Sequence, residues 1–317
     1  MAVAEKVILE TPNPTAVFRQ ILVATDFSQA SRRALSSALR LASGTDSRLS
    51  VIHVVHPDWR YEMLDTPPEL DLENSDEQLR LRTFVDDLQP GCEIEATLIK
   101  SGPVARTVVS VIADMGADLL VIGTRGRGGL SKLALGSVAE ELMRISPCPV
   151  MTIGPNAQSA AHGARFHTIL FATDFGKGSA RATPLALALA RTHQARLILL
   201  HMLAPIPTPS TSLSAFAPST TAADEVREWE RSSRKRWIRE LRDWLPGDTG
   251  LDHEPEYVVG TDFLPEGLLT AGEKYQVDLV VMGANHSNSG RLAAHVPWSA
   301  VHQVVRMARC PVLTVAG

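Results

Sequence analysis

The fold is decided by the stretch Gly123-Thr-Arg-Gly126-Arg-Gly-Gly-Leu-Ser-Lys-Leu-Ala-Leu-Gly136-Ser137-Val138, which lies between two short apolar segments. Residues 118–122 before it predict a buried strand, and residues 139–145 after it predict a helix that ends before a proline. Glycines allow tight turns and close approach to a ligand, and a helix N-terminus attracts anions. The pattern indicates a phosphate-binding loop, whose cations Arg125, Arg127 and Lys132 could neutralise phosphates. A plain surface turn is the alternative.

The overall composition is that of a globular protein. The chain has 317 residues, 44% of them hydrophobic, and a formal net charge of −4. Its length favours two domains, at roughly 150 residues per domain. No apolar run approaches the ~18 residues of a membrane span, and the first residues do not resemble a secretory signal. We therefore expect a cytoplasmic protein with no membrane partner. The negative charge and the lack of a dominant basic block argue against nucleic acid as its main partner.

The three cysteines favour packing over disulfide or metal chemistry. Cys148 and Cys310 each precede Pro-Val and an apolar run, which is typical of a buried thiol, and Cys92 stands apart from them. No Cys or His spacing predicts a metal site, so no metal ligand is assigned.

An internal repeat runs through the chain. The segment Ile21-Leu-Val-Ala-Thr-Asp26-Phe27 returns as Ile169-Leu-Phe-Ala-Thr-Asp174-Phe175, and the strand before Gly123 returns before Gly283. The segment that starts at Cys148 returns at Cys310. Repetition on this scale indicates two copies of one unit. We expect a first domain over residues 1–155 and a second over residues 165–317, with a linker between them; these are called the first and second halves below.

Strand and helix patterns alternate within the first half. Strands are predicted at residues 20–25, 48–55, 93–100, 118–122 and 149–153, and helices at residues 28–43, 71–88, 104–115 and 139–145. Such alternation implies an α/β fold, with a parallel sheet covered on both faces. In the second half, residues 222–245 predict an amphipathic helix whose tryptophans pack inward and whose basic run 231–236 is solvated. His53 and His201 lie in apolar strands and are interpreted as satisfied core histidines.

Three motifs together resemble the universal stress protein family in a tandem, two-domain form. They are Ala24-Thr-Asp26-Phe-Ser, the spacing Gly123-x2-Gly126-x9-Gly136-Ser137, and the closing strand Cys148-Pro-Val-Met-Thr-Ile. The resemblance implies two flavodoxin-like (Rossmann-like) domains, each a five-stranded parallel sheet of order 3-2-1-4-5. It also implies bound ATP, with Mg²⁺ as the companion of the phosphates. In such a sheet a crevice opens at the carboxyl ends of the first and fourth strands, where Asp26 and Gly123 both fall.

The resemblance also implies a set of binding residues in the first half. Contacts to adenine and ribose would come from Ala24, Asp26, Val54, Ile122 and Gly123. Contacts to the phosphates would come from Arg125, Gly126, Gly136, Ser137 and Val138. For Asp26 and Ser137 the role of a helix N-cap remains open as an alternative.

The second half departs from this pattern where phosphates would bind. His286 stands in place of the second glycine, and Trp298-Ser299 stand in place of Gly136-Ser137. An indole cannot share the space that a glycine leaves for a phosphate. We hypothesise that the second half has lost phosphate binding, with Trp298 closing the former cleft, although Asp174 remains. The alternative is a smaller or differently charged ligand.

No catalytic constellation is visible in the sequence. It lacks a Gly-x4-Gly-Lys-Ser/Thr loop or a Gly-x-Gly-x-x-Gly motif after the first strand, and it has no Gly-x-Ser-x-Gly elbow. No catalytic residue is assigned, and ATP hydrolysis is expected to be slow at most. The leading hypothesis is an ATP-binding stress-response or regulatory factor that acts on an unknown protein partner. A scaffold that binds no nucleotide is the alternative, and a nucleotide-using transferase is a third.

The last strand of each half is expected to pair with the other. Residues 149–153 and 311–315 would otherwise leave exposed sheet edges. Family resemblance suggests this pairing, which would make one chain an intramolecular pseudo-dimer. Whether two chains associate further into a homodimer stays open at this point.

Overall fold

The computed structural model describes residues 17–43, 45–55, 76–88, 94–124, 135–158, 165–203, 220–284 and 298–317, without the side chains of residues 220–227, 229 and 230. The first half contains β1 (Gln20–Thr25), α1 (Gln29–Ala42), β2 (Arg48–Val55), α3 (Asp76–Asp86), β3 (Ile94–Ser101), α4 (Val104–Met115), β4 (Leu119–Gly123), α5 (Ser137–Ile145) and β5 (Val150–Ile153). The second half contains β6 (Thr168–Ala172), α6 (Lys177–His193), β7 (Arg196–Met202), α7 (Thr220–Trp244), β8 (Glu256–Gly260), α8 (Glu266–Lys274), β9 (Leu279–Ala284), α9 (Trp298–Met307) and β10 (Val312–Ala316).

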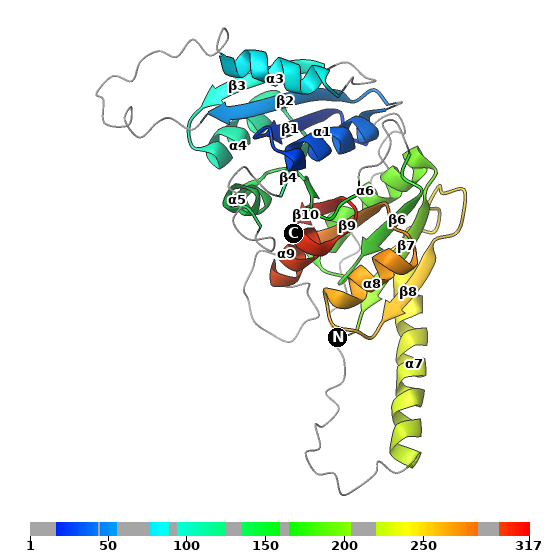
Figure 1. Ribbon diagram of the computed structural model, residues 1–317. Helices are drawn as coiled ribbons and strands as arrows, with labels where there is room; N and C mark the ends of the chain where they lie inside the picture. Colours follow the sequence, from blue (N-terminus) through cyan, green and yellow to red (C-terminus); the bar gives the residue numbers. More distant parts are fainter. Residues whose placement is uncertain are drawn as a thin grey trace, which may run out of the picture.

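All ten strands join one sheet, in the order β3-β2-β1-β4-β5-β10-β9-β6-β7-β8. Each half keeps the expected order 3-2-1-4-5 with parallel neighbours, which confirms the predicted fold class. β5 and β10 pair antiparallel, with Met151 opposite Leu313, so the expected pairing of the final strands is confirmed. Figure 1 shows the two halves meeting at these central strands, near the C-terminus.

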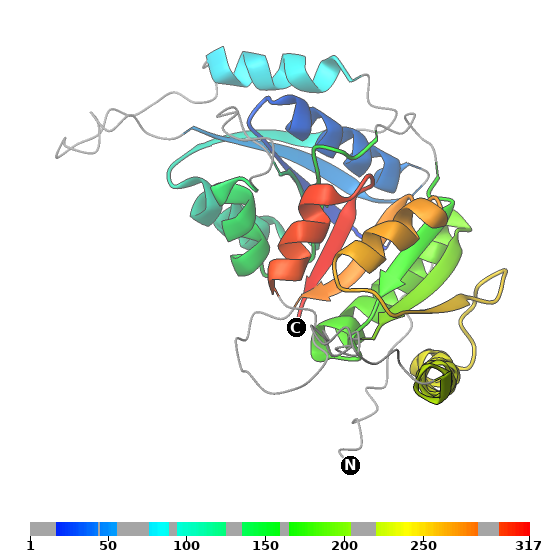
Figure 2. The same cartoon turned by 60° about the horizontal axis from the view of Figure 1, so that its bottom comes forward.

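The helices form two layers over the sheet. One core packs α1, α3, α6 and α7 against one face, and the other packs α4, α5, α8 and α9 against the opposite face. The central strands β4, β5, β9 and β10 are buried along almost their whole length, as expected for parallel strands covered on both sides. Figure 2 shows α7 end-on, apart from the other helices.

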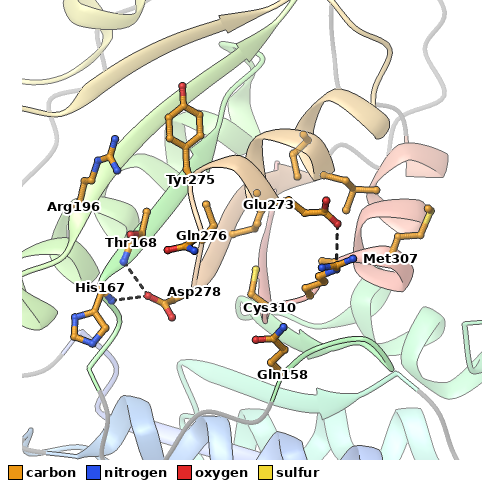
Figure 3. Close-up of a pocket in the computed structure, with 17 residues that line it drawn as sticks. Gln158, His167, Thr168, Arg196, Glu273, Tyr275, Gln276, Asp278, Met307 and Cys310 are labelled. Carbon is orange, nitrogen blue, oxygen red and sulfur yellow. Dashed lines mark hydrogen bonds and ion pairs between the residues drawn. The ribbon is translucent and has the colours of Figure 1, made fainter.

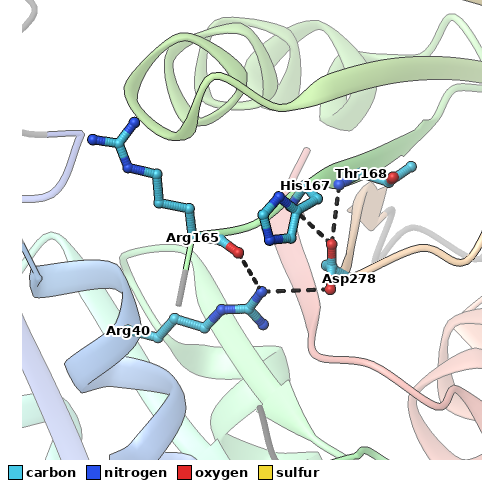
Figure 4. Close-up of polar contacts among 5 residues, drawn as sticks. All are labelled: Arg40, Arg165, His167, Thr168 and Asp278. Atoms are coloured by element: carbon cyan, nitrogen blue, oxygen red, sulfur yellow. Dashed lines mark hydrogen bonds and ion pairs between the residues drawn. The ribbon is translucent and has the colours of Figure 1, made fainter. Parts of the chain in front are cut away.

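A buried arginine joins the two halves at the amino ends of β6 and β9 (Figure 4). Near the end of α1, the Arg40 guanidinium donates to the Arg165 carbonyl at 2.7 Å and lies 3.4 Å from an Asp278 oxygen. It also lies 4.0 Å from the centre of the Phe166 ring. The Asp278 carboxylate accepts the backbone N–H groups of His167 and Thr168 as well. This cluster fixes the start of β6 and β9 against a helix of the first half.

Candidate functional site

The turn after β1 holds an unusual backbone conformation. Phe27 adopts φ +64°, in the left-handed region, which is rare for a bulky side chain. Its N–H donates to the Thr25 hydroxyl at 3.0 Å, and the N–H of Ser28 donates to Asp26 Oδ1 at 3.0 Å. Phe175 repeats the conformation in the second half, with φ +58°. Strained turns of this kind cluster at functional sites because surrounding contacts must hold them in place.

The second carboxylate oxygen of Asp26 is buried and has no hydrogen-bond partner among the described residues. The N-cap of α1 is Ser28, whose hydroxyl accepts from the N–H of Ser31, so the alternative role of Asp26 as the N-cap is wrong. Leaving a buried acceptor unpaired costs about 1–3 kcal/mol, and more for a charged group. Native proteins rarely keep such a group without a reason. The free Oδ2 atom is therefore a strong sign of a ligand-binding site at this edge of the sheet.

Gly123 serves close packing between β4 and α1. A Cβ atom at this position would lie 2.7 Å from the carbonyl carbon of Ala30 and 2.8 Å from the backbone nitrogen of Ser31. Real Cβ atoms do not approach backbone atoms so closely. The space that the glycine leaves open is thus filled by the protein, and it brings the start of α1 against the end of β4.

A backbone hydrogen bond from Gly136 holds the start of α5 beside the end of β4, at the same edge of the sheet. Its N–H donates to the Thr124 carbonyl at 2.9 Å, and the N–H of Thr124 donates to the Ile153 carbonyl at 3.1 Å. In this structure the Gly136 N–H is thus engaged within the protein, not left for a ligand as the sequence suggests. These bonds hold the beginning of α5 beside the end of β4, next to the turn that carries Asp26.

The first turn of α5 offers unused donors. Gly136 is the N-cap and has no side chain that could accept a hydrogen bond, so Ser137 is not the cap but the first helical residue. Among the described residues, none accepts a hydrogen bond from the N–H groups of Ser137, Val138 or Ala139. Ser137 and Val138 are exposed. A helix N-terminus with free N–H groups binds anions through these donors and through the helix dipole.

Apolar residues of three strands line the edge beside these groups. Ala24 lies opposite Ile122 in the pairing of β1 with β4, and Val54 lies at the end of the neighbouring strand β2. All three belong to the sheet face that α4 and α5 cover. Two further predicted contacts, Arg125 and Gly126, lie outside the described residues, as do Arg127 and Lys132. The structure thus gathers eight of the ten predicted residues at one edge.

In the second half, one oxygen of the matching carboxylate has two hydrogen-bond donors within the protein. Asp174 Oδ1 accepts from the N–H of Gly176 at 2.8 Å and from the Ser179 hydroxyl at 2.6 Å. In the first half the equivalent hydroxyl, on Ser31, donates to the Ser28 carbonyl at 3.0 Å instead. At the position of Gly136, α9 begins with Trp298, whose ring packs edge-on against His302 at 4.9 Å. His286 lies outside the described residues.

The two strand histidines have structural roles, as predicted. Nδ1 of His53 lies 2.7 Å from the Thr25 carbonyl, and Nδ1 of His201 lies 2.9 Å from the Thr173 carbonyl. A carbonyl can only accept, so each Nδ1 carries the proton. Burial lowers the pKa of His201. Both rings brace the strained turn in their half.

The tryptophans of α7 also pack inward. Trp237 stacks on Phe175 at 5.5 Å, and the Trp244 indole N–H donates to the Thr183 hydroxyl at 2.9 Å. The side chain of Trp229 lies outside the described residues. For the two described tryptophans, the predicted packed face of this helix is confirmed.

A separate hollow of about 710 Å³ lies at the amino ends of β6, β9 and β10 (Figure 3). Its charged groups already have partners: Arg309 pairs with Glu273 at 3.1 Å, and Asp278 holds the backbone at the start of β6. Burial raises the pKa of the Cys310 thiol to about 12, so this cysteine is unreactive at neutral pH. The charged groups of this hollow are thus paired within the protein. Among its described lining residues, none has a buried polar side-chain atom without a partner, as Asp26 has.

Within the described ranges, no group of three or more His, Cys, Asp or Glu side chains could hold a metal ion. In the same part of the chain, no helix is both long and apolar enough to cross a membrane.

Comparison with known proteins agrees with this architecture. The model of the universal stress protein family matches residues 17–154 and again residues 165–316. The chain belongs to the universal stress protein family. Among curated universal stress proteins, YxiE of Bacillus subtilis is 28% identical over 147 residues, which cover 43% of this chain and 99% of the relative. A universal stress protein of Thermus aquaticus is 31% identical over 140 residues, again 43% of this chain and 99% of the relative.

Two solved structures share the whole tandem fold. A universal stress protein from Archaeoglobus fulgidus superposes with a TM-score of 0.61 at 17% identity, covering 96% of this chain and 98% of its own. A putative universal stress protein from Pseudomonas aeruginosa gives a TM-score of 0.57 at 17% identity, covering 94% and 93% of the two chains. At this identity the likeness concerns the fold alone. The tandem arrangement of universal stress protein units therefore recurs in other members of the family.

Proposed function

We propose that the first half binds ATP and that the protein acts as a nucleotide-dependent regulatory factor in a stress response. The observation that carries this proposal is the buried, unpartnered Oδ2 of Asp26 beside the free N–H groups at the start of α5. An acceptor for ribose or amino hydrogens, an apolar wall and an anion-binding helix end are the three elements that an adenine nucleotide requires.

The residues present fit this ligand. Ala24, Val54 and Ile122 offer apolar surface for a base, Asp26 accepts hydrogen bonds, and Ser137 and Val138 present backbone donors. We expect Mg²⁺ to arrive with the phosphates, because the described residues hold no acidic cluster of their own for it. No catalytic residue is proposed, and any hydrolysis is expected to be slow.

We further propose that the second half does not bind phosphates and serves a structural or regulatory role. Its carboxylate Asp174 is already hydrogen-bonded, and a tryptophan occupies the start of α9. On this proposal the cytoplasmic protein carries one nucleotide per chain, held by the first half, and signals its occupancy to a protein partner.

The test is a matched pair of substitutions in the full chain. Nucleotide released from the denatured wild type should approach one adenine nucleotide per chain, and ATP with Mg²⁺ should bind in a calorimetric titration. Asp26→Ala should weaken binding at least about tenfold, since hydrogen bonds to a charged group contribute about 1.5–3 kcal/mol. Asp174→Ala, the control, should bind as the wild type does. Equal loss in both variants would contradict the assignment to the first half, and absence of binding in the wild type would favour the scaffold alternative.

A further inference from the structure

Helix α7 differs from its counterpart in the first half. It spans 25 residues, whereas α3 spans 11. Its last turns are anchored, because Leu241 is fully buried and Trp237 and Trp244 pack against the core. Figures 1 and 2 show the rest of the helix projecting away from the sheet, with no other element beside it.

One side of α7 carries a row of cations, the basic stripe, made of Arg231, Lys235, Arg239 and Arg242. Their spacing of four, four and three residues places them above one another on a helix. All four side chains are exposed. The end residues have acidic neighbours: Arg231 lies 3.8 Å from Glu228, and Arg242 lies 3.5 Å from Glu254.

The middle of the stripe is uncompensated. Lys235 and Arg239 form no ion pair or hydrogen bond with any described residue, and neither does the adjacent, exposed Arg234. Like charges four residues apart destabilise a helix by about 0.2–0.5 kcal/mol per pair. The stripe therefore opposes helix formation, and the packing of Trp237, Leu241 and Trp244 in the last turns offsets this effect. Nothing in the fold of the described residues requires these cations.

We propose that the basic stripe of α7 docks an acidic segment of a protein partner. A surface helix with a row of exposed cations, of which Lys235 and Arg239 have no acidic partner among the described residues, concentrates positive potential that attracts carboxylates at complementary spacing. Insertion into a membrane is disfavoured, because the described apolar side chains of α7, those of its last turns, are packed inside the protein. Nucleic acid is disfavoured, because Glu240 and Asp243 interrupt the basic surface and the whole chain carries a net charge of −4.

The test uses a fluorescently labelled polyglutamate peptide of about twenty residues and anisotropy titrations with the full-length protein. The wild type should bind, and binding should weaken as salt is added, because exposed charges are screened. Lys235→Glu/Arg239→Glu should bind about tenfold more weakly or worse. The control Lys100→Glu/Arg106→Glu makes the same charge change at exposed positions of the first half and should bind as the wild type does.

Several outcomes would overturn the proposal. They are no binding by the wild type, or equal losses in the two variants. Tighter binding to a DNA duplex or to phosphatidylserine vesicles than to the peptide would show that the class of partner is wrong. Thermal unfolding distinguishes lost docking from lost structure. The stripe variant should melt close to the wild type, because its new glutamates form opposite-charge pairs with Arg231 and Arg242, which offset the like-charge pair that remains between positions 235 and 239. Because the stripe is remote from Asp26, the result does not depend on whether ATP binds.

Discussion

The same kind of turn occurs in both halves, but the carboxylate in that turn has different hydrogen-bond partners in each half. Asp26 and Asp174 follow equivalent strands, β1 and β6, and each precedes a phenylalanine with positive φ. An equivalent histidine is hydrogen-bonded to each of the two turns. Yet Asp174 Oδ1 accepts a hydrogen bond from the Ser179 hydroxyl, whereas Asp26 Oδ2 is buried without a partner among the described residues. The repeat thus keeps the same turn in both halves, while the hydrogen bonds of its carboxylate differ.

The start of the helix that follows the loop shows the same division. In the first half, α5 begins after a glycine whose N–H joins the end of β4. In the second half, α9 begins with a tryptophan. The comparison teaches that two copies of one fold can differ in the side chains and hydrogen bonds found at equivalent positions.

The largest expected effect comes from replacing Gly136 of the first half with a tryptophan, the residue found at the equivalent position of the second half. Gly136→Trp should abolish ATP binding, because the indole would occupy the space in front of the N–H groups of Ser137 and Val138. A Cβ at Gly136 would already lie 3.3 Å from the Thr124 carbonyl oxygen. The measurement is nucleotide content together with calorimetric titration.

The matched control is Gly247→Trp, at a position where a Cβ meets no atom within 4 Å. It should bind ATP as the wild type does. ATP binding by Gly136→Trp at wild-type affinity would show that the start of α5 is not part of the site.

The junction between the halves should depend on Arg40. Arg40→Ala removes its ion pair with Asp278, its hydrogen bond to Arg165 and its contact with Phe166. The expected loss in free energy of unfolding is about 2–3 kcal/mol, because Asp278 loses its ion pair, although it keeps two backbone donors, and the Arg165 carbonyl loses its donor. Urea unfolding measures it. Arg32→Ala, which breaks an exposed pair with Asp87, should lose less than about 1 kcal/mol. Equal losses would mean that the buried cluster does not hold the halves together.

His193, buried beside this junction, should make stability depend on pH. Burial, and then the charges of Arg40 and Arg165, lower the pKa of His193 from 6.5 to about 4 in the folded state. The unfolded chain therefore takes up a proton more readily, and the stability present above pH 6.5 is lost as the pH falls towards 4. From pH 7 to 4.5, the wild type should lose about 2 kcal/mol more than His193→Gln does.

Urea titrations at both pH values test this expectation. His167→Gln, which alters an exposed histidine near the same junction, is the control and should follow the wild type. Identical pH dependence in wild type and His193→Gln would show that His193 titrates normally.

The smallest expected effect on stability comes from removing a serine hydroxyl, which is hydrogen-bonded to Asp174 in the second half but not to Asp26 in the first half. Ser179→Ala leaves Asp174 without its 2.6 Å hydrogen bond, and we expect a loss of about 2 kcal/mol. Ser31→Ala removes a hydrogen bond to the Ser28 carbonyl and the acceptor of the Thr25 hydroxyl. Because both partners are neutral, it should lose about 1 kcal/mol. Chemical unfolding compares the two. A larger loss of stability for Ser31→Ala than for Ser179→Ala would contradict this expectation. If Ser179→Ala bound a second ATP, the hydrogen bond to Asp174 would be what keeps ATP from binding to the second half.

The sequence by itself determined the repeat, the order of elements and the edge of the sheet at which the candidate residues gather. The predicted strands at 20–25 and 48–55 coincide with β1 and β2, and the predicted helix at 104–115 coincides with α4. The helix expected from residue 139 begins earlier, at Ser137, because Gly136 provides the cap position. These features could be predicted because hydrophobic period and turn residues are local properties of the chain.

Only the tertiary structure decided which polar groups are free. Whether Ser31 bonds to Ser28 or to Asp26, and whether Gly136 donates to Thr124, depends on distances between segments that packing brings together. The same holds for Gly123, where the missing Cβ makes room for α1, and for Arg40, whose partners lie in the other half. A sequence pattern names the atoms that can form hydrogen bonds, but the choice among nearby partners is made by three-dimensional geometry.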